Sequence, residues 1–311
     1  MATAIPAVET DQSKSEAVLP RPPISARAQL AETVTFLVIG AQKAGTTWIC
    51  DVLRRHPDVF IPDWKELHFF EQEPNFEKGY SWYLDFFRGS ESALARGEGT
   101  PNYFYNVCTP NEHRDWINRE VPQRIKDHLP DARLILSLRD PVQRAISSYN
   151  HFVLRGNLSP HTRLRDCWDE RGIRSAGRYD LQLAKWLEHY DLDQFEIVIY
   201  EDDIKPDERK LATANRLFRA IGVSAQADLP GLFERSNGRL DSALAHLNQV
   251  GFLRDNRYGR KIRDRINGAI PAPVQNLLKV KVDPQDVDAL REEFEPHNRA
   301  LEAMIGRKLP W

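Results

Sequence analysis

Residues 34–39, Val-Thr-Phe-Leu-Val-Ile, run directly into Gly-Ala-Gln-Lys-Ala-Gly-Thr-Thr at residues 40–47. A nearly continuous apolar run of this kind is typical of a parallel strand that is buried on both faces. An apolar stripe then predicts a helix from about Thr46 to His56, which Pro57 ends. Glycines allow the backbone to approach an anion closely, and the first amides of a helix point toward it. The segment therefore predicts a phosphate-binding loop between a buried strand and a helix.

The same order of strand, turn and helix recurs further along the chain. Residues 134–138 predict a strand, and Asp140 followed by Pro141 predicts the start of a helix. The remaining predicted elements are a helix at 178–190, a strand at 195–200 and helices at 207–220 and 286–305. Strands that alternate with helices predict an α/β fold, a single domain with a central parallel β-sheet flanked by helices. Residues 1–29 are expected to be a disordered tail, and residues 30–311 the domain.

Composition narrows the class of protein. The chain has 311 residues and a formal net charge of −2, which gives no reason to expect nucleic acid as a partner. Cys50, Cys108 and Cys167 lie far apart and form no disulfide or metal-binding pattern. No apolar run is long enough for a transmembrane segment, and the first residues do not have the pattern of a secretory signal. A cytoplasmic protein is the expectation, and the oligomeric state cannot be read from the sequence.

The predicted loop differs from a nucleotide P-loop. In the pattern G-x-x-x-x-G-K-[ST], a lysine follows the second glycine, whereas this chain has Thr46 there and its lysine at Lys43. A kinase uses its lysine together with a magnesium-bound hydroxyl to hold a polyphosphate. Lys43 is instead placed for a shorter anion, and no metal is required. A nucleotide or small-molecule kinase remains the alternative.

The loop resembles the 5′-phosphosulfate loop of sulfotransferases that use 3′-phosphoadenosine-5′-phosphosulfate (PAPS). This resemblance implies that Lys43 contacts the phosphosulfate and stabilises the oxygen that leaves. The cofactor contacts that it implies at this loop are Lys43, Ala44, Gly45, Thr46, Thr47 and Trp48. The product that would remain in the cleft is 3′-phosphoadenosine-5′-phosphate (PAP).

A second block at residues 138–149 carries the same resemblance. Arg139 follows a predicted strand, and Ser147 lies two turns into the next helix, so both are placed to face one crevice at the carboxyl edge of the sheet. The resemblance implies that both bind the 3′-phosphate, which distinguishes PAPS from ATP. The fork of an arginine suits bidentate binding of phosphate.

Lys-Glu-Leu-His-Phe-Phe at residues 65–70 supplies the candidate base. In an extended conformation Glu66 and His68 project to the same face, and an attacking hydroxyl needs a positioned base. The stretch resembles the heparan sulfate and related glycan sulfotransferases, which implies that Glu66 is the general base. His68 is the alternative base, and it is otherwise a hydrogen-bonded core histidine.

Weaker signals concern the acceptor. Residues 97–104 resemble another block of the same family, but Gly99 stands where several glycan enzymes carry a lysine, which argues against a polysaccharide acceptor. Gly238 and Arg239 are the nearest match to a late basic loop over the nucleotide. Residues 254–281 hold eight Lys or Arg against two Asp, which favours a solvated face. Aromatic residues that are candidates for stacking on an acceptor are Trp64, Tyr80, Trp82, Tyr83, Tyr103 and Tyr105.

The sequence therefore predicts a sulfotransferase that moves a sulfuryl group from PAPS to a carbohydrate or small-molecule acceptor, to a hydroxyl in preference to an amine. Transfer would be in line, with Glu66 as base and Lys43 at the leaving oxygen. A catalytically inactive PAP-binding module is the alternative that would need Lys43 and Arg139 but not Glu66.

Overall fold

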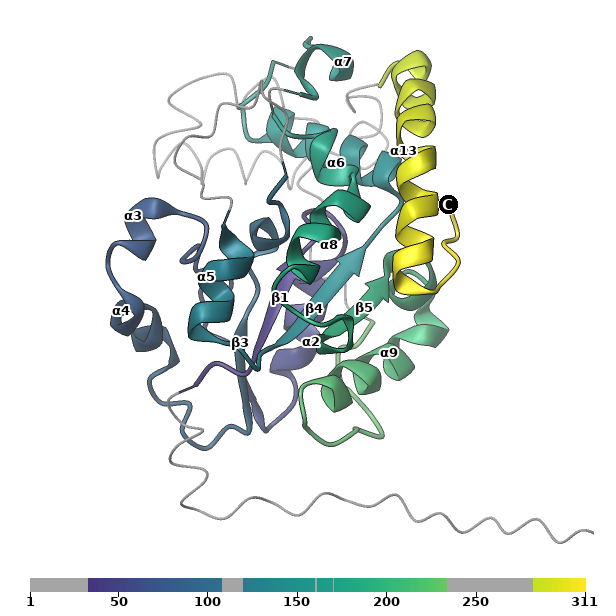
Figure 1. Ribbon diagram of the computed structural model, residues 1–311. Helices are drawn as coiled ribbons and strands as arrows, with labels where there is room; N and C mark the ends of the chain where they lie inside the picture. Colours follow the sequence, from purple (N-terminus) through teal and green to yellow (C-terminus); the bar gives the residue numbers. More distant parts are fainter. Residues whose placement is uncertain (1–32, 108–119, 160, 170, 234–281) are drawn as a thin grey trace, which may run out of the picture.

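The computed structural model describes residues 33–107, 120–159, 161–169, 171–233 and 282–311. These residues contain a five-stranded parallel sheet in the order β2-β3-β1-β4-β5. The strands are β1 Phe36–Gly40, β2 Val59–Phe60, β3 Ala95–Glu98, β4 Arg133–Leu138 and β5 Phe195–Ile199. The predicted α/β fold with a central parallel sheet is confirmed (Figure 1).

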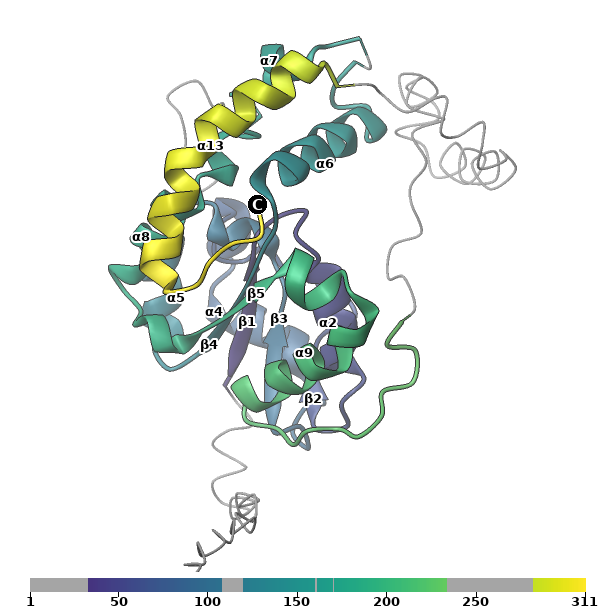
Figure 2. The same ribbon diagram turned by 90° about the vertical axis from the view of Figure 1, so that its right-hand side faces the viewer.

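Both faces of the sheet are covered, which explains why β1, at the centre of the sheet, has only apolar side chains before Gly40. Phe36 and Val38 of β1 pack in one cluster with α2 (Thr46–Arg54) and α9 (Asp207–Ala220). Leu37 and Ile39 pack on the opposite face with α5 (Val121–His128) and α8 (Tyr179–Leu187). The two layers are seen on either side of the sheet in Figure 2.

A third apolar cluster lies beyond the carboxyl end of β4. It joins α6 (Pro141–Leu154), α7 (Leu164–Cys167) and α13 (Pro284–Ile305). Helix α13 runs along α8 and α6, so the last part of the chain braces the helix that follows Arg139 (Figure 1). The shorter elements are α3 Glu73–Phe76, α4 Tyr80–Leu84, η1 Asp85–Phe87, η2 Pro101–Phe104, η3 Ser175–Gly177, η4 Leu192–Gln194 and the π-helical turn η5 Tyr200–Ile204.

The long elements agree with the sequence patterns. Asp140 caps α6 as predicted, since its carboxylate accepts hydrogen bonds from the amides of Val142 and Gln143. Strands β2 and β3 were not predicted, because β2 is two residues long and β3 reads Ala-Arg-Gly-Glu. The predicted tail at 1–29 and the basic segment at 254–281 lie outside the described residues.

Candidate active site

The predicted phosphate loop sits at the carboxyl edge of the sheet, between β1 and α2. The β1–β4 register shifts after Val38, and the Ala41 amide donates to the Ser137 carbonyl at 2.6 Å. The Ser137 hydroxyl donates to the Ala44 carbonyl at 2.6 Å and holds the far side of the loop. Among the described residues, no side chain caps the amino end of α2. The first amides of this helix are therefore directed at the space in front of the loop, as an anion requires.

Gly45 cannot readily be replaced at the start of α2. Its φ of 93° lies in the left-handed region, and a Cβ atom there would stand 2.9 Å from Cδ2 of Tyr200. The aromatic ring of Tyr200 thus packs directly against the loop backbone. The loop is a narrow cradle whose shape depends on the turn that follows β5.

Two cations meet at this loop. The Arg139 Nη1 group donates to the Lys43 carbonyl at 3.2 Å, and its guanidinium lies 5.0 Å from the ring centroid of Tyr200. Arg139 Nε is buried and finds no hydrogen-bond acceptor among the described residues; Oε1 of Glu201 is 4.0 Å away. Burial, and then the charge of Arg139, lowers the pKa of Lys43. A partly exposed guanidinium and a crowded ammonium both favour the arrival of an anion.

Two further predicted cofactor contacts, Trp48 and Ser147, lie on the helices α2 and α6. The Trp48 side chain is buried in the core, and its indole Nε1 donates to the Leu232 carbonyl at 3.3 Å. Trp48 therefore fixes α2 to the chain after α9. Ser147 is half-buried on α6, whereas the neighbouring Ser148 donates to the Gln42 side chain of the loop at 3.3 Å.

The structure brings Glu66 and His68 together, although not as an extended segment. His68 has a φ of 54°, so the backbone turns there, and Nε2 of His68 lies 3.7 Å from Oε2 of Glu66. Its Nδ1 atom is hydrogen-bonded to the buried carboxylate of Glu71. Burial alone would lower the pKa of His68, but the Glu71 hydrogen bond and the charges of Glu71 and Glu66 raise it. His68 therefore lies between an accessible and a buried carboxylate.

A further buried layer supports this turn. The Thr100 hydroxyl accepts from the His68 amide at 3.2 Å and donates to Oε2 of Glu98 at 2.8 Å. Burial raises the pKa of Glu98 to about 8. Sequence reasoning missed Glu71 and Glu98 because their role depends on contacts between β3 and the 65–71 segment. In the sequence, each is visible only as a charged residue, Glu71 directly after the stretch at 65–70 and Glu98 within the block at 97–104.

Lys65 connects the two halves of the site. Its Nζ lies 3.0 Å from Oε1 of Glu66 and donates to Oγ1 of Thr47 at 3.4 Å. An open cavity of about 620 Å³ lies beside these groups. Its lining residues are Asp63, Trp64, Lys65, Glu66, His68 and Arg155. A molecule in this cavity would touch the candidate base and lie next to the phosphate loop.

Gly99 has a packing role in this site. A Cβ atom at Gly99 would stand 2.4 Å from Cys50 Sγ and 3.7 Å from Cγ of Lys65. The Gly99 amide donates to the Lys65 carbonyl at 3.0 Å. The glycine is therefore explained by the close approach of Lys65 and Cys50, which weakens the argument from Gly99 against a polysaccharide acceptor. The Cys50 thiol itself is buried, and burial raises its pKa to about 12.

Most of the aromatic candidates belong to the core. Tyr83 and Tyr103 are fully buried, Tyr105 is buried, and Tyr80 and Trp82 pack against the same cluster. Trp64 is different, since it is 73% exposed and lines the cavity beside Glu66. Gly238 and Arg239 lie outside the described residues.

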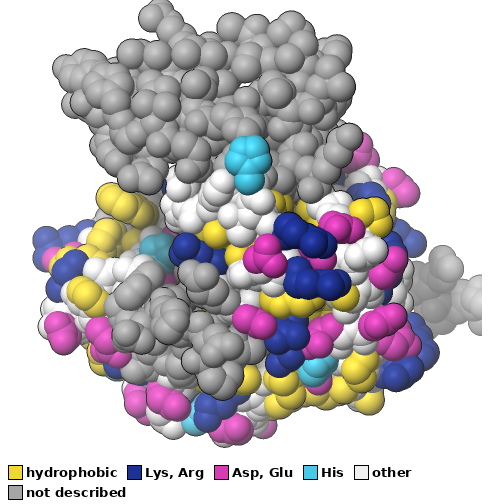
Figure 3. All heavy atoms as spheres, turned by 90° about the horizontal axis from the view of Figure 1, so that it is seen from above, with side chains coloured by type: hydrophobic (Ala, Val, Ile, Leu, Met, Phe, Trp, Pro, Cys, Tyr) yellow, Lys and Arg dark blue, Asp and Glu magenta, His cyan; other side chains and the backbone are white. Residues whose placement is uncertain are grey.

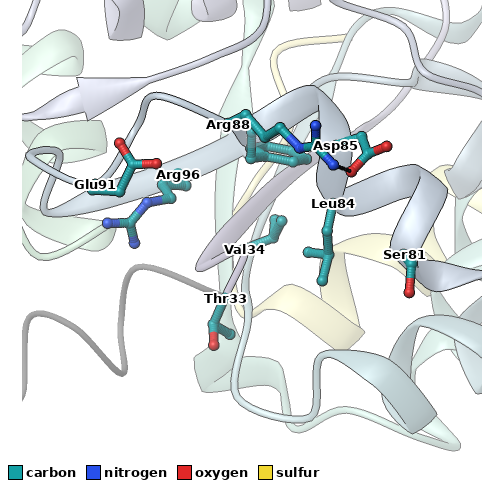
Figure 4. Close-up of a pocket in the computed structure, with 9 residues that line it drawn as sticks. Thr33, Val34, Ser81, Leu84, Asp85, Arg88, Glu91 and Arg96 are labelled. Atoms are coloured by element: carbon teal, nitrogen blue, oxygen red, sulfur yellow. Dashed lines mark ion pairs between the residues drawn. The ribbon is translucent and has the colours of Figure 1, made fainter.

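A second cavity, of about 400 Å³, lies at the amino edge of the sheet (Figure 4). There Arg88 pairs with Asp85 at 2.7 Å, and Arg96 donates to the carbonyls of Ser90 and Ala93.

Figure 3, a view of the molecule from above, shows Lys and Arg side chains interspersed with Asp and Glu. The distinctive anion site is therefore the loop at the carboxyl edge, and no single-sign surface is seen in that view.

The uncapped start of α2, with Lys43 and Arg139 beside it, has the features of an anion-binding site. The chain belongs to the sulfotransferase family, whose model matches residues 36–227. Heparan sulfate glucosamine 3-O-sulfotransferase 5 of Mus musculus is 26% identical over 289 residues, which cover 88% of this chain and 73% of that protein. Heparan sulfate glucosamine 3-O-sulfotransferase 3B1 of Mus musculus is 32% identical over 166 residues, which cover 51% of this chain and 39% of that protein.

A solved sulfotransferase from Alicyclobacillus acidocaldarius has the same fold. Its TM-score is 0.60 at 21% identity, and the match covers 89% of this chain and 97% of that one. The predicted enzyme class and the predicted resemblance to the heparan sulfate branch are both confirmed. Within the described ranges, no helix is both long and apolar enough to cross a membrane. The cytoplasmic location stays a prediction.

Proposed function

We propose that this sulfotransferase uses PAPS as its donor and sulfates a hydroxyl group of a carbohydrate or small molecule. The observation that carries the proposal is the position of Lys65, whose ammonium group contacts both Thr47 of the phosphate loop and the Glu66 carboxylate. Donor loop and candidate base are thus one side chain apart. Relatives that are named as heparan sulfate sulfotransferases support a carbohydrate acceptor.

The residues of the loop fit such a donor. The amides at the start of α2, with the hydroxyls of Thr46 and Thr47, suit a 5′-phosphate, and the partly exposed Arg139 guanidinium suits a second phosphate. When bound, PAPS supplies the activated sulfuryl group. At least two cations, Lys43 and Arg139, lie at this loop, which suits a ligand with more than one anionic group.

Glu66 is proposed to take the proton of the acceptor hydroxyl as the oxygen attacks sulfur. His68 holds this carboxylate from one side and is itself held by Glu71. Lys43 stabilises the electron pair that remains on the phosphate oxygen when the old S–O bond breaks. Trp64, exposed at the mouth of the cavity, offers a flat apolar surface to a sugar or another ring.

The test is calorimetric titration of the protein with PAP and with ADP, both without magnesium. We expect ADP to bind at least about tenfold more weakly, which is about 1.4 kcal/mol, because it lacks the 3′-phosphate. Arg139→Ala should remove most of this difference, whereas Arg88→Ala, at the opposite edge of the sheet, should leave it unchanged. Equal or tighter binding of ADP by the wild-type protein would overturn the proposal and favour a kinase.

A further inference from the structure

Lys65 has a position that neither the loop motif nor the base motif explains. Its side chain is only 14% exposed, although lysine is usually among the most exposed residues. The stem passes over Gly99, where a larger side chain would meet Lys65 Cγ and Cys50 Sγ. The backbone of Lys65 is held as well, since its carbonyl accepts from the Gly99 amide at 3.0 Å. The position of the ammonium group is thus fixed by the packing of the Lys65 side chain, whereas a solvent-exposed lysine would be free to move.

The contacts of this ammonium group leave one of its hydrogens unused. A lysine side chain has three N–H donors. Among the described residues, one is directed to Thr47 Oγ1 and another to Glu66 Oε1. Lys65 also lines the cavity beside Glu66. Its third N–H group therefore lies between the phosphate loop and this cavity.

We infer that Lys65 is a second catalytic cation, which donates a hydrogen bond to the sulfuryl group as it moves from the donor to the acceptor. The inference rests on the proposed function, because it needs a sulfuryl donor in the loop. Thr47 marks the position of the donor phosphate and Glu66 the position of the acceptor oxygen, so a group in transit passes between them. Lys65 keeps its proton throughout, while the acceptor proton goes to Glu66 and the electron pair of the broken S–O bond stays on the phosphate.

Lys65 and Lys43 therefore have separate tasks. Lys43 lies in the loop itself, where the Arg139 guanidinium contacts its carbonyl, so it serves the phosphate that both PAPS and PAP contain. Lys65 comes from the opposite side, on the segment that carries the base. It should contact only the sulfuryl group, which PAPS has and PAP lacks.

The experiment compares the affinities of PAP and PAPS by calorimetry, without an acceptor, for the wild-type protein, Lys65→Met and Lys43→Met. Methionine keeps the unbranched stem of Lys65 over Gly99 and removes the ammonium group. We expect Lys65→Met to weaken PAPS binding about tenfold, because a charge-assisted hydrogen bond is lost, and to leave PAP binding within about twofold. Lys43→Met should weaken both ligands. Lys65→Arg should restore part of the PAPS affinity.

Lys126→Met is the matched control, since Lys126 on α5 packs on Tyr190 and donates to the Pro130 carbonyl, away from the site. Unchanged PAP binding by Lys65→Met shows in the same titration that the loop is intact. If Lys65→Met weakens PAP and PAPS equally, or neither, the inference is wrong although the proposed function stands. If the wild-type protein does not bind PAP, the proposed function falls and this inference with it.

Discussion

The two edges of the sheet each carry a cavity lined by acidic and basic side chains, but the cations at the two edges differ in their partners. At the amino edge Arg88 pairs with Asp85, and Arg96 is satisfied by main-chain carbonyls and by the Ser90 hydroxyl. At the carboxyl edge Arg139 Nε lies 4.0 Å from Glu201 without a hydrogen-bond acceptor among the described residues, and the pKa of Lys43 is lowered by burial and by Arg139. Charges at the first edge have close partners within the chain, whereas those at the second are crowded and suit an anionic ligand. In an open α/β sheet this is the edge at which ligands bind.

The electrostatic surroundings of His151 on α6 support the same distinction. Burial, and then the charges of Lys43 and Arg155, lowers the pKa of His151 to about 4. A histidine on the first helix after Arg139 is thus neutral at physiological pH. Its neutrality avoids a further positive charge beside a loop that already holds Lys43.

The largest expected effect is the loss of turnover when the candidate base is removed. Glu66→Gln keeps the shape of the side chain but cannot take a proton, so kcat should fall by about 100-fold or more. PAP affinity should stay within about twofold, because Glu66 is on the acceptor side. The measurement is a steady-state assay with radiolabelled PAPS, together with calorimetry of PAP.

Glu91→Gln is the control for this variant, since Glu91 lines the cavity at the amino edge. It should leave both kcat and PAP affinity unchanged. Full turnover by Glu66→Gln would assign the base elsewhere, and His68→Asn would then be the variant to measure. Normal PAP binding without any turnover in the wild-type protein would instead favour the inactive PAP-binding module.

The sequence was sufficient for the parts of the fold that follow a regular pattern. β1, β4 and β5 were predicted because strands buried on both faces are apolar at almost every position, and α6 because Asp140 and Pro141 mark its start. β3 was not predicted, because Arg96 and Glu98 are charged and yet buried. Their burial is possible only with partners such as Ser90 and Thr100, which no periodicity in the sequence reveals.

The candidate site was proposed from local motifs. Lys43, Glu66 and His68 stay predicted site residues, and the structure places the last two together. Lys65 was overlooked beside Glu66, because a lysine next to a glutamate is usually a solvated residue. Only the path of its stem over Gly99 distinguishes it. Trp48 stays a predicted donor contact, although its ring lies in the core and leaves only its main-chain amide for that role.

The next effect in size concerns the buried carboxyl group beneath His68. Burial raises the pKa of Glu98 from 4.5 to about 8, so between these values the folded protein holds a proton that the unfolded chain releases. The free energy of unfolding should therefore fall as the pH rises from 4.5 to about 8 and level off above. Glu98→Gln removes this dependence and should raise stability at pH 8 by on the order of 4 kcal/mol.

Urea unfolding of wild type and Glu98→Gln across this pH range measures the difference. Glu91 offers the contrast at the other edge, since hydrogen bonds from its own amide and that of Gly89 lower its pKa. Glu91→Gln should therefore leave the slope above pH 4.5 unchanged. Parallel curves for wild type and Glu98→Gln would mean that Glu98 is ionised in the folded protein and paired more strongly than its neighbours indicate.

The smallest effect separates two glycines with almost the same backbone conformation. Gly45 in the phosphate loop has a φ of 93°, and Gly89 near the amino-edge cavity has a φ of 83°. Alanine at either position costs about 1 kcal/mol for the left-handed conformation. At Gly45 the new Cβ also meets Tyr200 Cδ2 at 2.9 Å, whereas nothing lies within 4 Å at Gly89. Gly45→Ala should therefore be about 1 kcal/mol more destabilising than Gly89→Ala.

A double-mutant cycle with Tyr200→Leu tests the cause of this difference. If the contact with the ring is responsible, Gly45→Ala should cost no more than Gly89→Ala once Tyr200 is replaced. The same cycle followed by PAP calorimetry reports on function, because only Gly45→Ala displaces amides that face the donor. Equal costs for both glycines in the wild-type background would show that the ring moves aside freely, and that the cradle is set by the hydrogen bonds of Ser137 rather than by Tyr200.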